Sequence, residues 1–150
     1  MARLLVVHHS PTPNLRAILD AVVAGARHED IEDVEVVVRE ALSATVDDVL
    51  AADGYVIGTS ANIGYLSGAV KHFFDVTFDA ASEATRGRPY SYWVHGRSDT
   101  SGAERAMESI TTGLGWQKVV DPLCFLGPPD DAHLAVATEL GATVAATLMS

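Results

Sequence analysis

The chain has 150 residues, 48% of them hydrophobic, and a formal net charge of −10 at pH 7. This length suits one domain over residues 1–150, and the negative charge argues against nucleic acid or an anionic membrane as the main partner. No apolar run approaches the ~20 residues of a membrane span, and the single cysteine, Cys124, excludes an internal disulfide. We therefore expect a cytoplasmic protein, with Cys124 as a buried core residue.

The first predicted strand, about Arg3 to His8, stops at a short polar loop, and a helical pattern begins at Leu15. Helix N-termini carry unpaired backbone N–H groups and a partial positive charge, so they bind anions. The loop also supplies side-chain hydrogen-bonding groups from Ser10, Thr12 and Asn14. The stretch predicts a phosphate cradle, although the same side chains would also serve a simple helix start with Asn14 as the N-cap.

Strand and helix patterns alternate along the rest of the chain. Short β-branched or aromatic runs predict strands, and apolar residues three or four apart predict helices. The expected strands are 34–38, 55–58, 90–95 and 119–125, and the last of these is broken at Pro122. The expected helices are 15–26, 46–51, 67–78, 103–112 and a last one from Asp130 to near Leu148. Ser43 or Thr45 would cap the second helix, and Gly113 and Gly115 would end the fourth. Five such units predict an α/β fold with a parallel sheet between two helical layers.

Three loops follow the first, third and fourth expected strands, starting at His9, Thr59 and Gly96. All three are short and rich in hydroxyls, amides or glycine. In parallel sheets, ligands bind outside the carboxyl ends of the strands, where the strand order reverses. These loops are therefore the candidate binding site.

The sequence excludes several common α/β sites. No glycine lies between Met1 and Val23, which excludes a dinucleotide-binding G-x-G-x-x-G after the first strand. The P-loop pattern and the G-x-S-x-G of esterases are also absent. A receiver domain would need acidic residues where His8 and His9 stand and a phosphorylatable aspartate where Thr59 stands.

The stretch from Asp53 to Asp75 resembles the pattern D-G-hydrophobic-G-[TS]-P-x-aromatic-x-G-x-x-[SG]-x-x-K-x-[FW]-x-D of the flavodoxin superfamily, which includes flavodoxins and NAD(P)H-dependent FMN and quinone reductases. Ser10-x-Thr12-x-Asn14 is similar to the superfamily's phosphate loop, and the segment 95–102 stands where the superfamily has its third flavin loop. The resemblance implies a flavodoxin-like three-layer sandwich with a five-stranded parallel sheet of order 2-1-3-4-5.

The resemblance also implies FMN as a non-covalently bound cofactor. Its phosphate would lie on residues 10–15 and its ring between the loops at Thr59 and Gly96, where glycine lets the backbone approach closely. The cofactor-binding residues that it implies are Ser10, Thr12, Asn14, Leu15, Thr59, Ser60, Ala61, Asn62, Ile63, Gly64, His95, Gly96, Arg97 and Gly102.

The match departs from the pattern at three positions. Ser60 replaces the proline, and Asn62 and Ile63 stand where many members have aromatic residues that cover the flavin ring. Each lost aromatic pair weakens binding by ~1 kcal/mol. A member of the superfamily that has lost FMN stays open as an alternative.

Three functions follow from these features. The first is an NAD(P)H-dependent oxidoreductase of a quinone or similar small acceptor, because an uncovered flavin face suits hydride transfer; a homodimer would fit this function. The second is an electron carrier to a basic redox partner protein, which the acidic charge suits. The third is a flavin-free binding protein on the same fold.

Three histidines, His8, His9 and His95, stand at strand ends, where they could converge as metal ligands. No carboxylate or cysteine joins them at ligand spacing, so no metal is expected. His95 is a candidate hydrogen-bond donor beside the flavin. Arg97 would contact the flavin or a nicotinamide phosphate, or remain a surface charge. Trp116 is expected to pack against the sheet.

Overall fold

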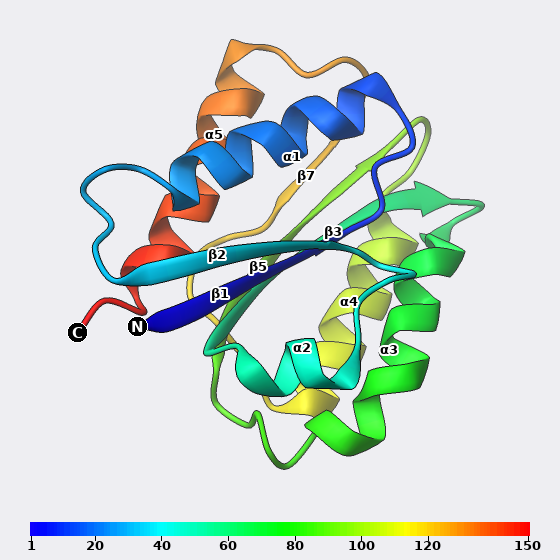
Figure 1. Ribbon diagram of the computed structural model, residues 1–150. Helices are drawn as coiled ribbons and strands as arrows, with labels where there is room; N and C mark the ends of the chain where they lie inside the picture. The colour runs from blue at the N-terminus through cyan, green and yellow to red at the C-terminus, as the bar shows by residue number, and fades with distance from the viewer.

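The central strand β1 (Ala2–His8) is buried on both faces. The computed structural model, which describes residues 1–150, has Leu4 and Val6 in one hydrophobic core and Leu5 and Val7 in another. Strand side chains alternate between the two faces, so a strand buried on both sides must be a continuous apolar run. The first core lies under α1 (Pro13–Ala26) and α5 (Asp131–Ala146), and the second over α2 (Val46–Ala51), α3 (Gly68–Ala81) and α4 (Ser101–Leu114) (Figure 1).

The strand order confirms the predicted architecture. The parallel sheet runs β2 (Val34–Glu40), β1, β3 (Gly54–Asn62), β5 (Pro89–Gly96), and the fifth position beside β5 is shared by β6 (Gln117–Lys118) and β7 (Leu123–Leu126). The sheet thus has seven strands rather than five, because the expected fifth strand is divided and a short β4 (Tyr65–Leu66) pairs with β3. Pro122, which has no N–H to donate, lies in the gap between β6 and β7.

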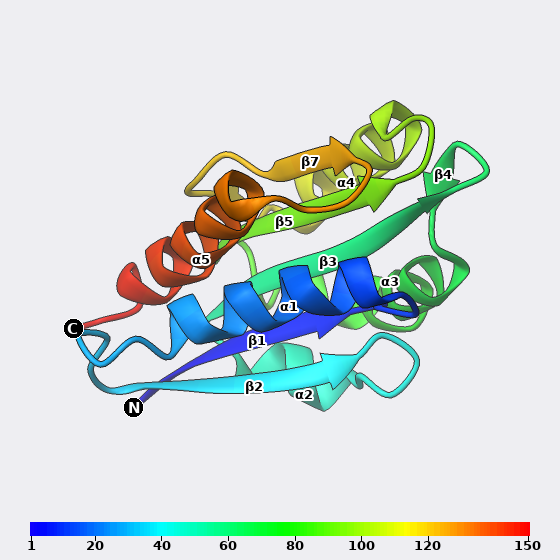
Figure 2. The same ribbon diagram turned by 90° about the horizontal axis from the view of Figure 1, so that it is seen from above.

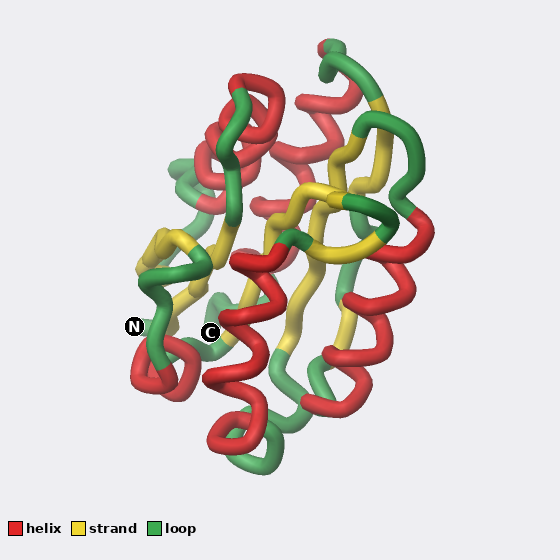
Figure 3. The backbone as a smooth tube through the Cα atoms, turned by 90° about the vertical axis from the view of Figure 1, so that its right-hand side faces the viewer, coloured by secondary structure: helices red, strands yellow, loops and turns green.

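The expected loop at Thr59 is mostly strand. β3 continues to Asn62, with Thr59 and Ser60 in register with Val94 and His95 of β5. It then turns back into β4 through Ile63 and Gly64, whose φ angles are 51° and 74°. Two positive φ angles are the mark of the tight turns that join antiparallel strands. Figure 3 shows this hairpin and the short connection to α3.

The helices agree with the predicted pattern except at their ends. α1 begins two residues earlier than expected, with Pro13 in its first turn, where a missing N–H costs nothing. Its N-cap is Thr12 rather than Asn14: the Thr12 hydroxyl accepts from the backbone N–H of Leu15 at 3.2 Å. Gly113 lies inside α4, and Gly115 alone ends that helix in the left-handed conformation. Thr45, Ser67 and Asp130 cap the three other helices whose caps use side chains.

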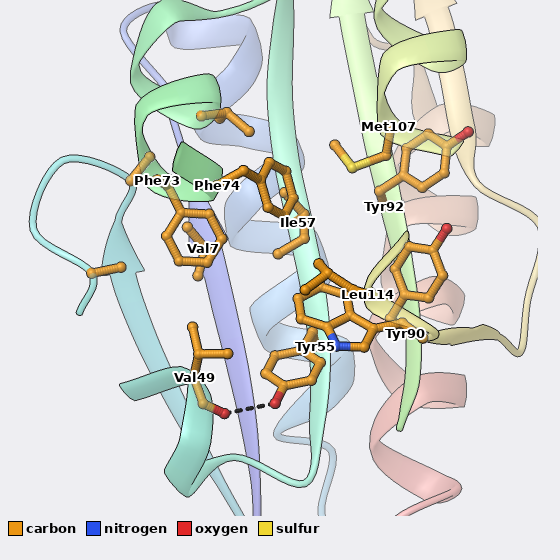
Figure 4. Close-up of a cluster of buried hydrophobic side chains, with 14 of the residues drawn as sticks. Val7, Val49, Tyr55, Ile57, Phe73, Phe74, Tyr90, Tyr92, Met107 and Leu114 are labelled. Carbon is orange, nitrogen blue, oxygen red and sulfur yellow. Dashed lines mark hydrogen bonds between the residues drawn. The ribbon is translucent and has the colours of Figure 1, made fainter. Parts of the chain in front are cut away.

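Aromatic side chains fill the core below the sheet (Figure 4). Tyr55 stacks on Trp116 with 4.0 Å between ring centroids, and its hydroxyl donates to the carbonyl of Val49 at 2.6 Å. Trp116 therefore packs against the sheet, as expected. Cys124 is only half-buried, but burial raises the pKa of its thiol to about 12. None of the helices combines the length and apolar character needed to cross a membrane.

α1 and α5 approach each other through two glycines. A Cβ atom on Gly25 would lie 1.9 Å from the carbonyl oxygen of Thr138, and one on Gly141 would lie 2.0 Å from that of Val22. Real side-chain atoms do not come so close to backbone atoms. The two helices pack at this distance only because both positions lack a side chain.

We predict that Gly25→Ala lowers the free energy of unfolding by about 1–3 kcal/mol, because α1 and α5 must separate. A loss of stability would be informative, since alanine normally stabilises a helix interior by up to ~1 kcal/mol relative to glycine. Urea denaturation measures the change. Gly68→Ala is the control: a Cβ added there would meet no other part of the protein within 4 Å, so stability should stay equal or rise. An equal loss in both variants would contradict the packing role.

Candidate functional site

A pocket of about 380 Å³ lies at the carboxyl ends of β1, β3 and β5. Figure 2 shows these strands pointing to one end of the molecule, where their loops gather, while both chain termini lie at the other end. The volume is in the range of ~300–1,000 Å³ that small-molecule sites occupy. The pocket, called the main pocket below, is lined by Pro11, Thr12, Asn14, Leu15, Ser60, Ala61, Asn62, His95, Gly96 and Arg97.

The loop between β1 and α1 contributes free hydrogen-bond donors. The backbone N–H groups of Ser10, Thr12 and Asn14 donate to no group of the protein, and the prolines between them have no N–H. The carbonyl of Thr12 already accepts from Arg16, so the first turn of α1 is complete without these donors. Three unpaired N–H groups at the start of a 14-residue helix form an anion-binding site by their partial charges.

Ser10 differs from the other polar residues of this loop. Its hydroxyl lies 2.9 Å from Nδ1 of His8, and it lines a smaller hollow of about 240 Å³ beside the end of β2, which also contains His9 and Glu40. His8 is only 7% exposed, and burial lowers the pKa of its imidazole; nearby Glu40 opposes the shift and His9 adds to it. The Ser10 side chain is therefore not among the groups that line the main pocket.

The end of β3 supplies a polar group that lacks a partner. The Ser60 hydroxyl is buried and forms no hydrogen bond within the protein, although Ser60 lines the main pocket. A buried unsatisfied group of this kind costs about 1–3 kcal/mol, which a ligand that satisfies it would recover. Thr59 has a different role: its hydroxyl donates to the Ser60 carbonyl at 2.8 Å and accepts from the N–H of Ser67 at 3.1 Å, which ties β3 to the start of α3. Thr59 lies behind the main pocket and does not line it.

The end of β5 brings His95 and Gly96 to the main pocket. Nε2 of His95 lies 2.7 Å from the carbonyl oxygen of Gly127, and because a carbonyl only accepts, this nitrogen carries the proton. Nδ1 has no partner within the protein. A Cβ on Gly96 would lie 3.0 Å from the Cβ of Ala61, so glycine allows the ends of β3 and β5 to stay close. Arg97 lies exposed at the rim.

Three further predicted residues, in addition to Ser10 and Thr59, lie outside the main pocket. Ile63 is fully exposed and lines an adjoining open hollow of about 760 Å³, together with Ala61, Asn62, Arg97 and Ser98. Gly102 and Gly64 are in contact with each other, because a Cβ on Gly102 would lie 1.8 Å from the Gly64 oxygen. Their contact lets α4 approach the β3–β4 hairpin, and they line a separate hollow of about 340 Å³ beside Tyr65 and Arg105.

Nine of the predicted residues thus meet in the main pocket, and sequence reasoning missed one more, Pro11. The prolines at 11 and 13 were the available signal, because neither has an N–H, and the free N–H groups of the loop are left at alternate positions around Pro11. No group of three or more histidine, cysteine or acidic side chains converges to hold a metal ion.

Proteins of similar sequence or structure identify the fold of this chain. No protein-family model matches the sequence. A flavodoxin of Aquifex aeolicus is 37% identical over 75 residues, which are 50% of this chain and 40% of that protein, so the match spans less than half of the relative's length. Among solved structures, an archaeal flavodoxin has a TM-score of 0.80 at 21% identity, covering 97% of this chain and 98% of its own.

A second structural neighbour comes from a different functional class. An NADH:FMN oxidoreductase, solved in its apo form, has a TM-score of 0.80 at 14% identity and covers 100% of this chain and 91% of its own. At these identities, both neighbours show that the chain shares their overall fold. The chain therefore has the fold of the flavodoxin-like superfamily.

Proposed function

We propose that this chain binds FMN non-covalently in the main pocket and acts as a flavodoxin-type electron carrier. The observation that carries the proposal is the combination, at one pocket, of free backbone N–H groups at a helix start, those of Thr12 and Asn14, and a buried hydroxyl without a partner. An anionic ligand with further polar groups satisfies both features. The flavodoxin relative from Aquifex aeolicus and the flavodoxin structures of the same fold support FMN as that ligand.

The residues present fit FMN. The N–H groups of residues 10, 12 and 14, with the side chains of Thr12 and Asn14, would hold the phosphate. Ser60 and Asn62 would supply hydrogen bonds to the polar atoms of the rest of the cofactor, and Gly96 lets the backbone approach it. When bound, FMN supplies the redox chemistry, and the protein supplies binding, orientation and electrostatics.

The charge of the chain favours a carrier. A protein of net charge −10 attracts a basic partner over long distances and accelerates its docking. The free N–H donors of the β1–α1 loop give the phosphate local attraction against this overall negative field. A basic redox protein is therefore the partner that we propose, and the rate of its reaction should fall with ionic strength.

A second candidate is the NAD(P)H-dependent oxidoreductase of a quinone or similar acceptor. The observation that favours it is the open hollow of about 760 Å³ that adjoins the main pocket and shares Ala61, Asn62 and Arg97 with it. This hollow has room for a second ligand beside the cofactor, and the Arg97 guanidinium is a partner for a nicotinamide phosphate. Homodimer formation belongs to this candidate and stays a prediction.

We predict that Ser60→Ala weakens FMN binding about fivefold, the equivalent of ~1 kcal/mol, because the ligand loses a hydrogen bond. Without FMN, the variant should be as stable as the wild type or more stable, since a buried unsatisfied hydroxyl has been removed. Quenching of FMN fluorescence measures the affinity, and urea denaturation the stability.

Ser91→Ala is the matched control. Its hydroxyl is buried in the same sheet, away from the main pocket, and donates to the carbonyl of Val120 at 2.9 Å. This variant should lose about 1 kcal/mol of stability and keep its FMN affinity. If Ser60→Ala binds FMN as tightly as the wild type, Ser60 does not contact the cofactor. If the wild type does not bind FMN at all, the flavin-free binding protein is the function that stands.

We further predict that NADPH and NADH leave the visible absorbance of the FMN-loaded protein unchanged, whereas dithionite bleaches it. The reduced protein should then reduce cytochrome c, a basic acceptor, at a rate that falls as salt is raised, because opposite charges steer the encounter. Stopped-flow absorbance at several ionic strengths gives the rates. Rapid bleaching by NADPH, with turnover of a quinone, would instead establish the oxidoreductase.

A further inference from the structure

The hydrogen bond between His8 and Ser10 raises the question of which group donates. Ser10 Oγ lies 2.9 Å from His8 Nδ1, and a hydroxyl has only one proton. If Nδ1 is unprotonated, the hydroxyl must donate to it and offers only lone pairs to any neighbouring anion. If Nδ1 carries a proton, it donates to Oγ, and the Ser10 hydroxyl is then free to donate to the anion.

The pair of His8 and Ser10 lies beside the proposed phosphate site, because Ser10 stands near the start of the β1–α1 loop. Its own backbone N–H is one of the three free donors, and Pro11, the next residue, lines both the main pocket and the hollow that contains His8. A phosphate on these N–H groups would therefore lie beside the Ser10 hydroxyl. An oxygen that presents only lone pairs to a phosphate repels it, whereas a donated O–H attracts it.

The surroundings of His8 favour a change of protonation when an anion arrives. His8 is held firmly, because its carbonyl accepts from Ala41 at 2.8 Å and the N–H of His9 donates to Gly58 at 3.0 Å. Without a ligand, burial keeps the pKa of His8 below its ordinary value, so the imidazole is neutral at pH 7. A phosphate dianion nearby would reverse that preference, since opposite charge favours the imidazolium.

The charged groups around His8 are few. Glu40, at the paired position on β2, acts to raise the pKa of His8, and His9 on its own strand acts to lower it. On β3 the paired residue is Gly58, which has no side chain. The other charged side chains of the adjoining elements include Arg39 on β2 and Arg16 and Asp20 on α1, and none of them is among the groups that shift the pKa of His8. Glu40 is thus the group of the protein that supports a positive charge on His8.

We propose that His8 is a positioning residue that takes up a proton when the FMN phosphate binds and thereby turns the Ser10 hydroxyl toward that phosphate. The inference rests on the proposed function. For each FMN that binds, His8 takes up one proton from the buffered solvent. An Nδ1–H···Oγ hydrogen bond then replaces Oγ–H···Nδ1, and the freed Ser10 hydroxyl donates to a phosphate oxygen. His8 itself does not touch the cofactor.

Isothermal titration calorimetry tests this proton balance. FMN is titrated into the full chain at pH 7 in two buffers of different ionisation enthalpy, which gives the number of protons taken up. His8→Asn is the key variant, because the amide that replaces Nδ1 can turn to donate to Ser10 without a change of charge. We expect this variant to bind FMN within about threefold of the wild-type affinity and to take up close to one proton fewer.

Two further variants separate positioning from simple packing. His8→Phe removes the donor and should weaken FMN binding about tenfold, while its urea denaturation reports whether the fold is intact. His72→Asn is the matched control, because His72 is exposed on α3 away from the main pocket, and it should keep the wild-type proton uptake. Above pH 7 the affinity of the wild type should fall more steeply than that of His8→Asn, since a linked proton contributes up to tenfold per pH unit.

Nitrogen NMR of the His8 ring gives a readout independent of affinity. We expect an unprotonated Nδ1 in the free protein and an imidazolium with saturating FMN or inorganic phosphate. A ring that stays neutral in the FMN complex, or equal proton uptake in wild type and His8→Asn, would overturn the inference and leave the proposed function intact. A wild type that binds neither FMN nor phosphate would overturn both.

Discussion

Burial of the central strands on both faces is the constraint on which the rest of this structure depends. β1, β3 and β5 satisfy their backbone groups by pairing with the strands on either side of them, and the helical crossovers between successive strands let them run parallel. Parallel strands bring all their carboxyl ends to one edge of the sheet. The polar loops, far apart in the chain, are thereby forced together at that edge (Figure 2).

The site at this edge combines rigid and unsatisfied parts. Glycine allows close backbone approach at Gly96 against Ala61 and at Gly102 against Gly64, which fixes the β3–β4 hairpin beside β5 and α4. Against this fixed frame, the free N–H groups of the β1–α1 loop and the buried Ser60 hydroxyl have no partners of their own. Because these unpaired groups are already held in place by the surrounding structure, few residues need to become ordered when a ligand binds.

Electrostatics act on two scales in this molecule. In the proposed function, the net charge of −10 acts over the distance between proteins and steers a basic partner. The helix start of α1 and the hydrogen bond between His8 and Ser10 act over a few ångströms, where we propose that they attract the phosphate. An acidic protein can therefore bind a phosphate, because screening and distance weaken the global field more than the local donors.

The sequence by itself determined the alternation of strands and helices and the three segments of the candidate site, since these depend on hydrophobic period and on local loop chemistry. The sheet order came from the resemblance of residues 53–75 to the flavodoxin superfamily. Thr12, Asn14, Ser60 and His95 accordingly line one pocket. Only the tertiary structure decided that Thr59 faces α3, that Gly64 and Gly102 pack together, and that the Ser10 hydroxyl turns to His8. Those choices depend on which partner lies within hydrogen-bond or contact distance. That partner is set by the packing of strands and helices from distant parts of the chain, which no local pattern encodes.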